Sequence, residues 1–538
     1  MSRMTNRLLF SFLFFALFGT DALAQTINAA SCSQTDVQAA FNAATASTTI
    51  INIPSGTCHW TTKVNLNVPS ASTALSVLGA GSLTTTGGTD RTIIIDDDTA
   101  DSDKLINLVL NNTTSSFFRF AGITIQGGSG SIKQNGVVAL QGLSHRVRMD
   151  HNHFNAMTYS PGATFKIRFT QWLYGVFDHN ICDGGTSPSG CAFEIWMDSY
   201  GGSGAEGDGA WADTTGFGSD RFMFFEDNIM NNNGTGSGAV NDSAHGARYV
   251  IRHNTIYRES TQTHPTGGSG RGRGTRAQEV YLNTFTGSDS AQTNTANWIS
   301  SGTALIWGNT ASEQGYQTFL NLHSMRGDAS TYTQAAPPNG WGYCGTKTSG
   351  TASHWDQNSS ATTGWRCLDQ PGTGAGDLLI NGFPNVTNQA TGCVSSSPCA
   401  WPRQALEPVY EWLNVWACTG CSNRAFSSVQ ITGATALTQN VDYYLCTTPG
   451  TGACSGFDGT RGVGAGSLSA RPPTCTAGPG GNTNGVAYWA TDQNTLYVCN
   501  PTNTWTAYYA PYTYPHPLTQ GNLPAPPAAP TNLGATVQ

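Results

Sequence analysis

The chain has 538 residues, of which only 11% are Asp, Glu, Lys or Arg, whereas Gly alone occupies 63 positions. The formal net charge is −8 at neutral pH. Binding to nucleic acid or to an anionic membrane draws on clustered positive charge, so we expect neither as a partner. The low charge and the high glycine content are typical of a turn-rich β protein and not of a helical enzyme.

Residues 1–24 have the composition of a secretory signal peptide. Arg3 and Arg7 precede the apolar stretch LLFSFLFFALFG, and the segment ends in the small residues ALA. The apolar stretch is too short for a comfortable membrane span. We therefore expect a protein that is secreted, to the extracellular space or the periplasm, and that acts as a monomer without a membrane anchor.

A short helix followed at once by a strand is predicted for residues 32–62. Val37, Ala40 and Phe41 fall on one face of that helix, and the strand has the sequence IINIPSGTCHW. A helix in this place would cap a solenoid, because an uncovered first coil exposes core side chains and strand edges.

Six asparagines, each just after a short apolar strand, predict the fold. They are separated by 28, 48, 26, 29 and 26 residues and are Asn152, Asn180, Asn228, Asn254, Asn283 and Asn309. A repeat of this length, made of strands, predicts a right-handed parallel β-helix. Asn tolerates the left-handed backbone of a tight turn and can bond to the same residue one coil away, so we expect a stacked ladder. A β-sandwich with Asn-rich turns is the alternative.

A second column of strands, 11 to 15 residues before the ladder asparagines, contains the charged residues that could form a site. Its members are residues 137–142, 165–171, 193–199 and 239–245, with 261–267 as a fifth. Alternation along the strands is expected to turn outward Lys166, Arg168, Glu194, Trp196 and Asp198, followed by Asp242, His245 and His264. Coils about 4.8 Å apart would bring these side chains together.

Two kinds of chemistry fit this patch, and a structural alternative remains. In β-elimination of a uronic acid polymer, Glu194, Asp198 and Asp242 could hold Ca²⁺, and Lys166, Arg168, His245 or His264 could take the proton. In glycoside hydrolysis, two of the carboxylates would be acid and base, about 5 to 9.5 Å apart. Sugar rings could stack on Trp196. Alternatively, the opposite charges form a cross-strand ladder that only stabilises the sheet.

A glycine-rich segment, residues 264–280, presents three arginines. Arg271, Arg273 and Arg276 could offer guanidinium groups to the carboxylate or sulfate groups of a substrate. The alternative is that these arginines pair with acidic groups of the protein itself.

All fourteen cysteines follow the signal peptide, and an even number in an exported chain predicts disulfides. Pairing of neighbours would join Cys32 with Cys58, Cys182 with Cys191, Cys344 with Cys367, Cys393 with Cys399, Cys418 with Cys421, Cys446 with Cys454, and Cys475 with Cys499, although sequence alone leaves the connectivity open.

The last third of the chain changes in character. From about residue 335 it is rich in Cys and aromatic residues, which predicts final coils and a C-terminal cap over residues 336–515; a sugar-binding module is the alternative. Residues 516–538 contain the Pro- and Ala-rich run PAPPAAP and predict an extended linker.

The helix DVQAAFNAA, the strand INIPSGTCHW, the turn LGAGS and the HNxF coils together resemble the pectin-lyase-like superfamily over about residues 30 to 330. That resemblance implies a right-handed parallel β-helix for residues 25–335. It does not imply one reaction, because the superfamily includes lyases, hydrolases, esterases and adhesins, and the NTD and RIK motifs of particular pectin-degrading enzymes are absent here. We expect a protein that binds, and cleaves by elimination or hydrolysis, an acidic extracellular polysaccharide. A non-catalytic adhesin or spacer that binds glycans is the alternative.

Overall fold

The structure is a computed structural model that describes residues 25–520, apart from 84–86, 101–102, 111–113, 132, 134, 157–165, 184–192, 203–206, 232–237, 266–272, 288–294, 313–315, 325–368, 376–404, 418–426 and 434–436. The expected signal peptide, the boundary expected at residue 335 and the end of the expected linker therefore lie outside the described residues. None of the helices in the described part is long and apolar enough to cross a membrane.

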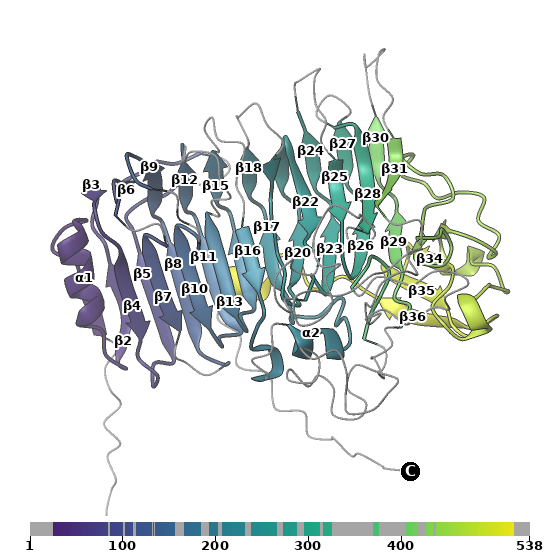
Figure 1. The fold of residues 1–538 in the computed structure, drawn as a ribbon, viewed down its shortest axis with the longest axis horizontal. Helices are drawn as coiled ribbons and strands as arrows, with labels where there is room; N and C mark the ends of the chain where they lie inside the picture. Colours follow the sequence, from purple (N-terminus) through teal and green to yellow (C-terminus); the bar gives the residue numbers. More distant parts are fainter. Residues whose placement is uncertain are drawn as a thin grey trace, which may run out of the picture.

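The described chain winds in coils that place strands on three faces. Within each face the strands are parallel, as in a parallel β-helix (Figure 1). One face, the first sheet, has twelve strands in spatial order. They are β1 (Gln25–Asn28), β2 (Thr48–Asn52), β5 (Ala74–Leu78), β8 (Phe117–Ala121), β11 (Arg146–Asp150), β14 (Gly175–Asp178), β17 (Met223–Glu226), β20 (Arg248–Arg252), β23 (Ala277–Tyr281), β26 (Thr303–Trp307), β29 (Val409–Trp412) and β32 (Tyr443–Tyr444).

The second sheet has ten strands, each of which follows a strand of the first sheet along the chain, after only a few residues in every case but β6. They are β3 (Gly56–Trp60), β6 (Thr92–Asp96), β9 (Thr124–Gly127), β12 (His153–Asn155), β15 (Ile181–Asp183), β18 (Ile229–Asn231), β21 (Thr255–Tyr257), β24 (Thr284–Thr286), β27 (Thr310–Ser312) and β30 (Val415–Ala417).

The third face consists of two five-stranded sheets. One contains β4 (Val64–Val68), β7 (Ile106–Leu110), β10 (Val138–Gly142), β13 (Ile167–Gln171) and β16 (Phe193–Trp196), and the other contains β19 (Gly238–Ala239), β22 (Glu259–Thr263), β25 (Thr295–Ile299), β28 (Thr318–Ser324) and β31 (Ser427–Gly433). Residues 241–244 lie between them, because isolated parallel bridges pair Phe193 with Asn241, Trp196 with Ala244, and Ser243 with Thr263.

Alternation of side chains builds the core. In β4, Val64, Leu66 and Val68 are fully buried, whereas Asn65 and Asn67 between them are not. Burying one such apolar side chain stabilises the fold by roughly 1.5–3 kcal/mol, and each coil repeats the pattern. The interior is therefore one continuous apolar column, and the outer faces carry the polar residues.

Helix α1 (Gln34–Asn42) lies at the N-terminal end of the coils and contacts β3 and β4 (Figure 1). It starts where the Ser33 side chain accepts a hydrogen bond from the Asp36 N–H. Val37, Ala40 and Phe41 are buried, as the sequence predicts. A shorter helix, α2 (Asp208–Ala212), lies beside the coils further along the chain (Figure 1).

The asparagine ladder is confirmed. Five of the six asparagines receive two hydrogen bonds on the side-chain oxygen, from the N–H and the Nδ2 of the preceding asparagine in the ladder. The first asparagine, Asn152, instead accepts from the Ile123 N–H at 3.3 Å. The ladder has a seventh member, Asn414, which follows Asn309 by 105 residues and accepts both of its bonds at 2.9 Å. The sequence period does not reveal Asn414 because a long insertion separates it from the other coils.

The prediction that the ladder asparagines themselves adopt the left-handed backbone conformation is wrong. The left-handed residue is the one before each asparagine, with φ between 54° and 62° at His151, His179, Asp227, His253, Leu282, Gly308 and Leu413. The asparagine instead points inward and is 0–2% exposed. Its amide therefore supplies buried hydrogen bonds and does not serve as the turn residue.

Three of the expected disulfides are present, Cys32–Cys58, Cys446–Cys454 and Cys475–Cys499. Cys182 is also disulfide-bonded. The remaining expected pairs involve cysteines outside the described residues. No described cysteine is a free thiol.

After the last coil the chain forms a small sheet and then turns back along the first sheet. The small sheet contains β33 (Val463–Gly466), β34 (Ala487–Ala490), β35 (Thr495–Cys499) and β36 (Trp505–Tyr509). Residues 512–520 follow, ending in the 3₁₀ helix η6 (Pro517–Thr519), which contacts β14 and β11. His516 and Leu518 are buried there, so this part of the expected linker is packed onto the β-helix.

Candidate functional site

The site lies on the outer side of the third face, where β13, β16 and residues 241–245 are neighbours. Arg168 pairs in register with Glu194. Because Phe193 is bridged to Asn241, Glu194 in turn lies beside Asp242. One outward row therefore holds a guanidinium and two carboxylates on successive coils, as the alternation along the strands predicts.

An aromatic stack runs along the next outward row. The Arg168 guanidinium lies 3.9 Å from the centre of the Trp196 ring, and the His245 imidazole is stacked on that ring at 4.1 Å. These two groups come from the coils on either side of β16, so they cover opposite faces of the indole. The expectation that Trp196 offers an open ring face to a sugar is therefore wrong. Trp196 instead orients Arg168 and His245.

Two histidines are paired with carboxylates at the same place. His245 Nδ1 is hydrogen-bonded to Asp198 Oδ1, and His264 Nε2 lies 3.8 Å from Asp242 Oδ1. The His264 Nδ1 contacts the Pro265 carbonyl oxygen at 2.8 Å. We call the group formed by Arg168, Glu194, Trp196, Asp198, Asp242, His245 and His264 the ionic cluster.

Access to solvent differs within the ionic cluster. The side chains of Asp198, Asp242 and His264 are 33%, 30% and 35% exposed, whereas those of Arg168 and Glu194 are 9% and 8% exposed. The cluster therefore has a buried Arg168–Glu194 pair beneath a rim of titratable groups that a ligand can reach.

Burial raises the pKa of Glu194 to about 8, an effect that Arg168 opposes and that the nearby carboxylates of Asp242 and Asp198 reinforce. The Arg168 Nε and Glu194 Oε2 atoms are 2.8 Å apart, but their orientation does not make a hydrogen bond. Asp242 Oδ1 is likewise buried without a hydrogen-bond partner. A carboxyl group with a raised pKa beside another carboxylate is typical of acid–base sites.

Lys166 does not join the ionic cluster. It immediately precedes Ile167, which pairs with Val138, so it occupies the position of the core residue Val137. Its side chain is buried, the residue being 2% exposed, and burial lowers its pKa to about 8. The expectation that Lys166 faces outward is wrong, because the chain bends at this corner before strict alternation begins.

The arginines of residues 264–280 are not available to a substrate where the structure describes them. Arg273 forms a two-pronged ion pair with Asp369, and Arg276 is fully buried and contacts Glu407 at 2.7 Å. Both guanidinium groups lie over Trp211. The alternative that they pair with the protein's own acidic groups is correct for these two, and Arg271 lies outside the described residues. The partners Asp369 and Glu407 are about 100 residues away in the chain, which is why sequence reasoning missed them.

The ionic cluster does not fit the expected calcium site. Calcium prefers six to eight oxygen ligands, but Glu194 faces Arg168 and Asp198 holds His245. In the described part of the chain, no group of three or more His, Cys, Asp or Glu residues is arranged to hold a metal ion. We therefore assign no step of the proposed reaction to Glu194, Asp198 or Asp242 as metal ligands.

Comparison with known proteins gives little further information. No family model and no curated protein sequence matches the chain. Among solved structures, it is similar to an alginate lyase from Paenibacillus sp. str. FPU-7, with 14% sequence identity and a TM-score of 0.34, over 55% of this chain and 98% of that one. A similarity of this degree carries no argument about function, which must come from the ionic cluster itself.

Proposed function

We propose that the protein is an exported polysaccharide lyase that binds an acidic polysaccharide across the ionic cluster and cleaves it by β-elimination. The observation that carries this proposal is the hydrogen bond between Asp198 and His245 beside the buried Arg168–Glu194 pair. A histidine oriented by a carboxylate is the usual form of a general base.

The proposed base is Nε2 of His245. In the proposed tautomer, the Nδ1–H of His245 donates a hydrogen bond to Asp198, so Nε2 carries the free lone pair. Nε2 removes the proton from C5 of a uronate residue, a C4–C5 double bond forms, and the C4–O4 bond breaks. The leaving oxygen takes a proton from a cluster acid.

Glu194 is the proposed acid. Its pKa of about 8 keeps it largely protonated at neutral pH, so it can supply the proton that the leaving oxygen needs. Arg168, held against Trp196, provides the positive charge that stabilises the substrate carboxylate as negative charge develops at C5. Only residues of the ionic cluster are used.

Hydrolysis is a second candidate, and one observation favours it. Glu194, with a raised pKa, and Asp242 lie at the same register position on adjacent coils. Adjacent strands are about 4.8 Å apart. Carboxyl groups about 5–5.5 Å apart are typical of retaining glycosidases.

The test is activity on a panel of pectate, alginate and glycosaminoglycans. Elimination gives an unsaturated product that absorbs ultraviolet light, whereas hydrolysis gives new reducing ends without that absorbance. We expect ultraviolet absorbance on at least one acidic polymer and its loss in His245→Ala. Reducing ends without absorbance would replace elimination by hydrolysis. Binding without either signal would contradict both and favour the adhesin.

A further inference from the structure

A second candidate binding site lies far along the chain from the ionic cluster, in a cavity of about 440 Å³ beside the last coil. None of the ionic cluster residues lines it. Its polar side chains come from two segments, the turn before β32 and the loop before β33, and are Gln439, Asn440, Thr447, Ser455, Asp458 and Arg461. Leu445 and Pro449 add apolar surface. The volume is within the range of small-molecule sites.

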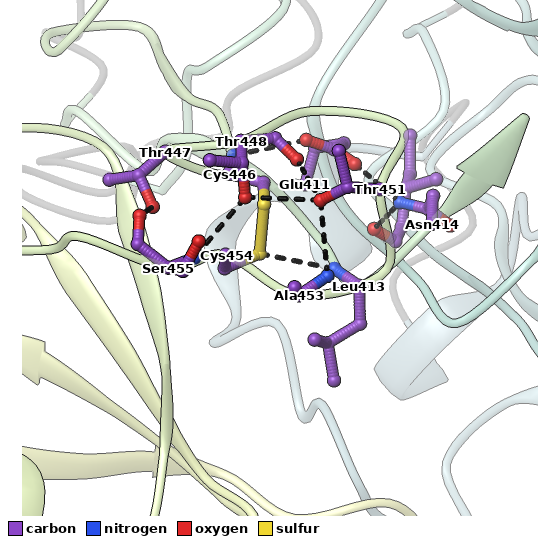
Figure 2. Close-up of a disulfide and its surroundings, with 11 residues drawn as sticks. Glu411, Leu413, Asn414, Cys446, Thr447, Thr448, Thr451, Ala453, Cys454 and Ser455 are labelled. Carbon is purple, nitrogen blue, oxygen red and sulfur yellow. Dashed lines mark hydrogen bonds between the residues drawn. A yellow bond between two sulfur atoms is a disulfide. The ribbon is translucent and has the colours of Figure 1, made fainter.

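The wall of the cavity is fixed by covalent and hydrogen bonds. The disulfide Cys446–Cys454 ties the lining residue Cys446 to the chain just before Ser455. The Thr447 hydroxyl donates to the Ser455 carbonyl at 2.8 Å, and the Ser455 N–H donates to the Thr448 hydroxyl at 3.2 Å (Figure 2). The Gly462 N–H donates to Asn440 Oδ1 at 2.8 Å. A ligand therefore meets a wall that is already formed, which lowers the entropy lost on binding.

Arg461 is the group in the cavity best placed to take a ligand. Its side chain is exposed, and within the described part of the chain it forms no ion pair. The carboxylate of Asp458 is nearby but is held by Thr460, whose hydroxyl and N–H donate to it at 2.6 and 2.9 Å. Those hydrogen bonds, with a smaller contribution from Arg461, lower the pKa of Asp458. The guanidinium is therefore free to bind a carboxylate in two-pronged fashion.

We propose that this cavity binds a short acidic saccharide. The sugar carboxylate would lie on Arg461, its hydroxyl groups would bond to Asp458 and Gln439, and its apolar ring face would lie on Leu445 and Pro449. A single guanidinium next to acceptor groups fits a ligand that carries both a carboxylate and hydroxyls, whereas a simple anion would leave Asp458 unused. This site is non-catalytic and does not depend on the reaction at the ionic cluster.

The experiment is titration calorimetry of the full chain with trimers of galacturonate and of mannuronate, with cellotriose as the neutral probe. All proteins carry Arg168→Ala, so that binding at the ionic cluster is weakened and a failure there does not affect the result. We expect binding of at least one acidic trimer and not of cellotriose. Arg461→Ala should weaken that binding at least tenfold, because it removes a charge-assisted pair of hydrogen bonds.

Two matched variants make the outcome specific. Arg91→Ala removes another exposed arginine, far from the cavity, and should leave the affinity unchanged. Arg461→Lys keeps the charge but not the planar fork, and should restore part of the affinity. The proposal is overturned if no acidic trimer binds, if cellotriose binds equally well, or if Arg461→Ala binds as tightly as its parent.

Discussion

The winding of the chain lines up charged residues on two outer faces. One group is buried by a distant segment of the chain, and the other stays partly exposed to solvent. On the first sheet, Glu226 and Arg252 are neighbours in register and are fully buried, and residues 512–516 are hydrogen-bonded to both of them. Arg252 donates to the carbonyl oxygens of Tyr512 and Thr513, and the His516 N–H donates to Glu226. We call this group the covered row.

In the ionic cluster the same kind of row keeps Asp198, Asp242 and His264 about one third exposed. Rows of ionic residues therefore follow from the stacking of coils alone and are not by themselves a sign of function. Whether a row binds the protein's own chain or a ligand depends on what a distant segment covers. Four experiments test this difference, in order of decreasing expected effect.

The largest effect should follow removal of the proposed base. His245→Ala should lower kcat/KM by about a hundredfold to ten-thousandfold, because the general base is lost. The measurement is the initial rate of ultraviolet absorbance on the best polymer. His59→Ala, which removes a largely exposed histidine paired with Asp97, is the control and should keep the full rate. Equal rates in the two variants would show that His245 is not the base.

Removal of the central cation of the covered row should act on stability instead. Arg252→Ala leaves Glu226 buried without its ion-pair partner and should reduce the free energy of unfolding by about 3–5 kcal/mol. Denaturant unfolding measures the loss, and limited proteolysis after residue 509 should become faster. Arg91→Ala is the control. If Arg252→Ala instead abolished activity without loss of stability, the assignment of the two rows would be reversed.

Two carboxyl groups with a raised pKa, Glu194 in the ionic cluster and Glu279 under the C-terminal segment, can be compared by their dependence on pH. Burial raises the pKa of Glu279 to about 7, above its usual value of 4.5. The folded state therefore binds more protons than the unfolded state, so stability is greatest below about pH 4.5 and falls as the pH rises to about 7. Glu194 should behave in the same way up to about pH 8.

We expect Glu194→Gln and Glu279→Gln each to reduce this fall in stability, by roughly 1–3 kcal/mol between pH 5 and pH 8. Only Glu194→Gln should also lower the rate of cleavage, because Glu279 is held by the Gly218 N–H and the Tyr509 hydroxyl under the C-terminal segment. Thermal unfolding across the pH range and the ultraviolet assay measure the two effects. A rate loss in Glu279→Gln alone would contradict the proposed acid.

The smallest effect should come from removal of divalent cations. Because the carboxylates of the ionic cluster face Arg168 and His245, a chelator should change the rate by less than about twofold. A change of that size is expected when the added ions screen charges on the protein surface. The assay is run with and without the chelator and after calcium is added back. A loss that calcium restores would return Glu194, Asp198 and Asp242 to the role of metal ligands.

Sequence reasoning located most of the ionic cluster, because parity along a strand and the spacing of coils are local and periodic properties. Arg168, Glu194 and Trp196 lie where these rules place them. The rules failed for Lys166, which sits at a corner where strict alternation has not begun. They also could not show that Trp196 would be enclosed, because its ring contacts depend on side-chain orientations in three coils.

The periodic asparagines and the alternation of apolar residues determined by themselves that the chain would form parallel coils, because each repeat contacts mainly its neighbours. Only the tertiary structure decided which ionic groups remain accessible. Arg273 and Arg276 pair with Asp369 and Glu407, and residues 512–516 cover Glu226 and Arg252. These contacts join segments about 100 to 290 residues apart, and no local pattern encodes them because they depend on where the ends of long insertions return to the solenoid.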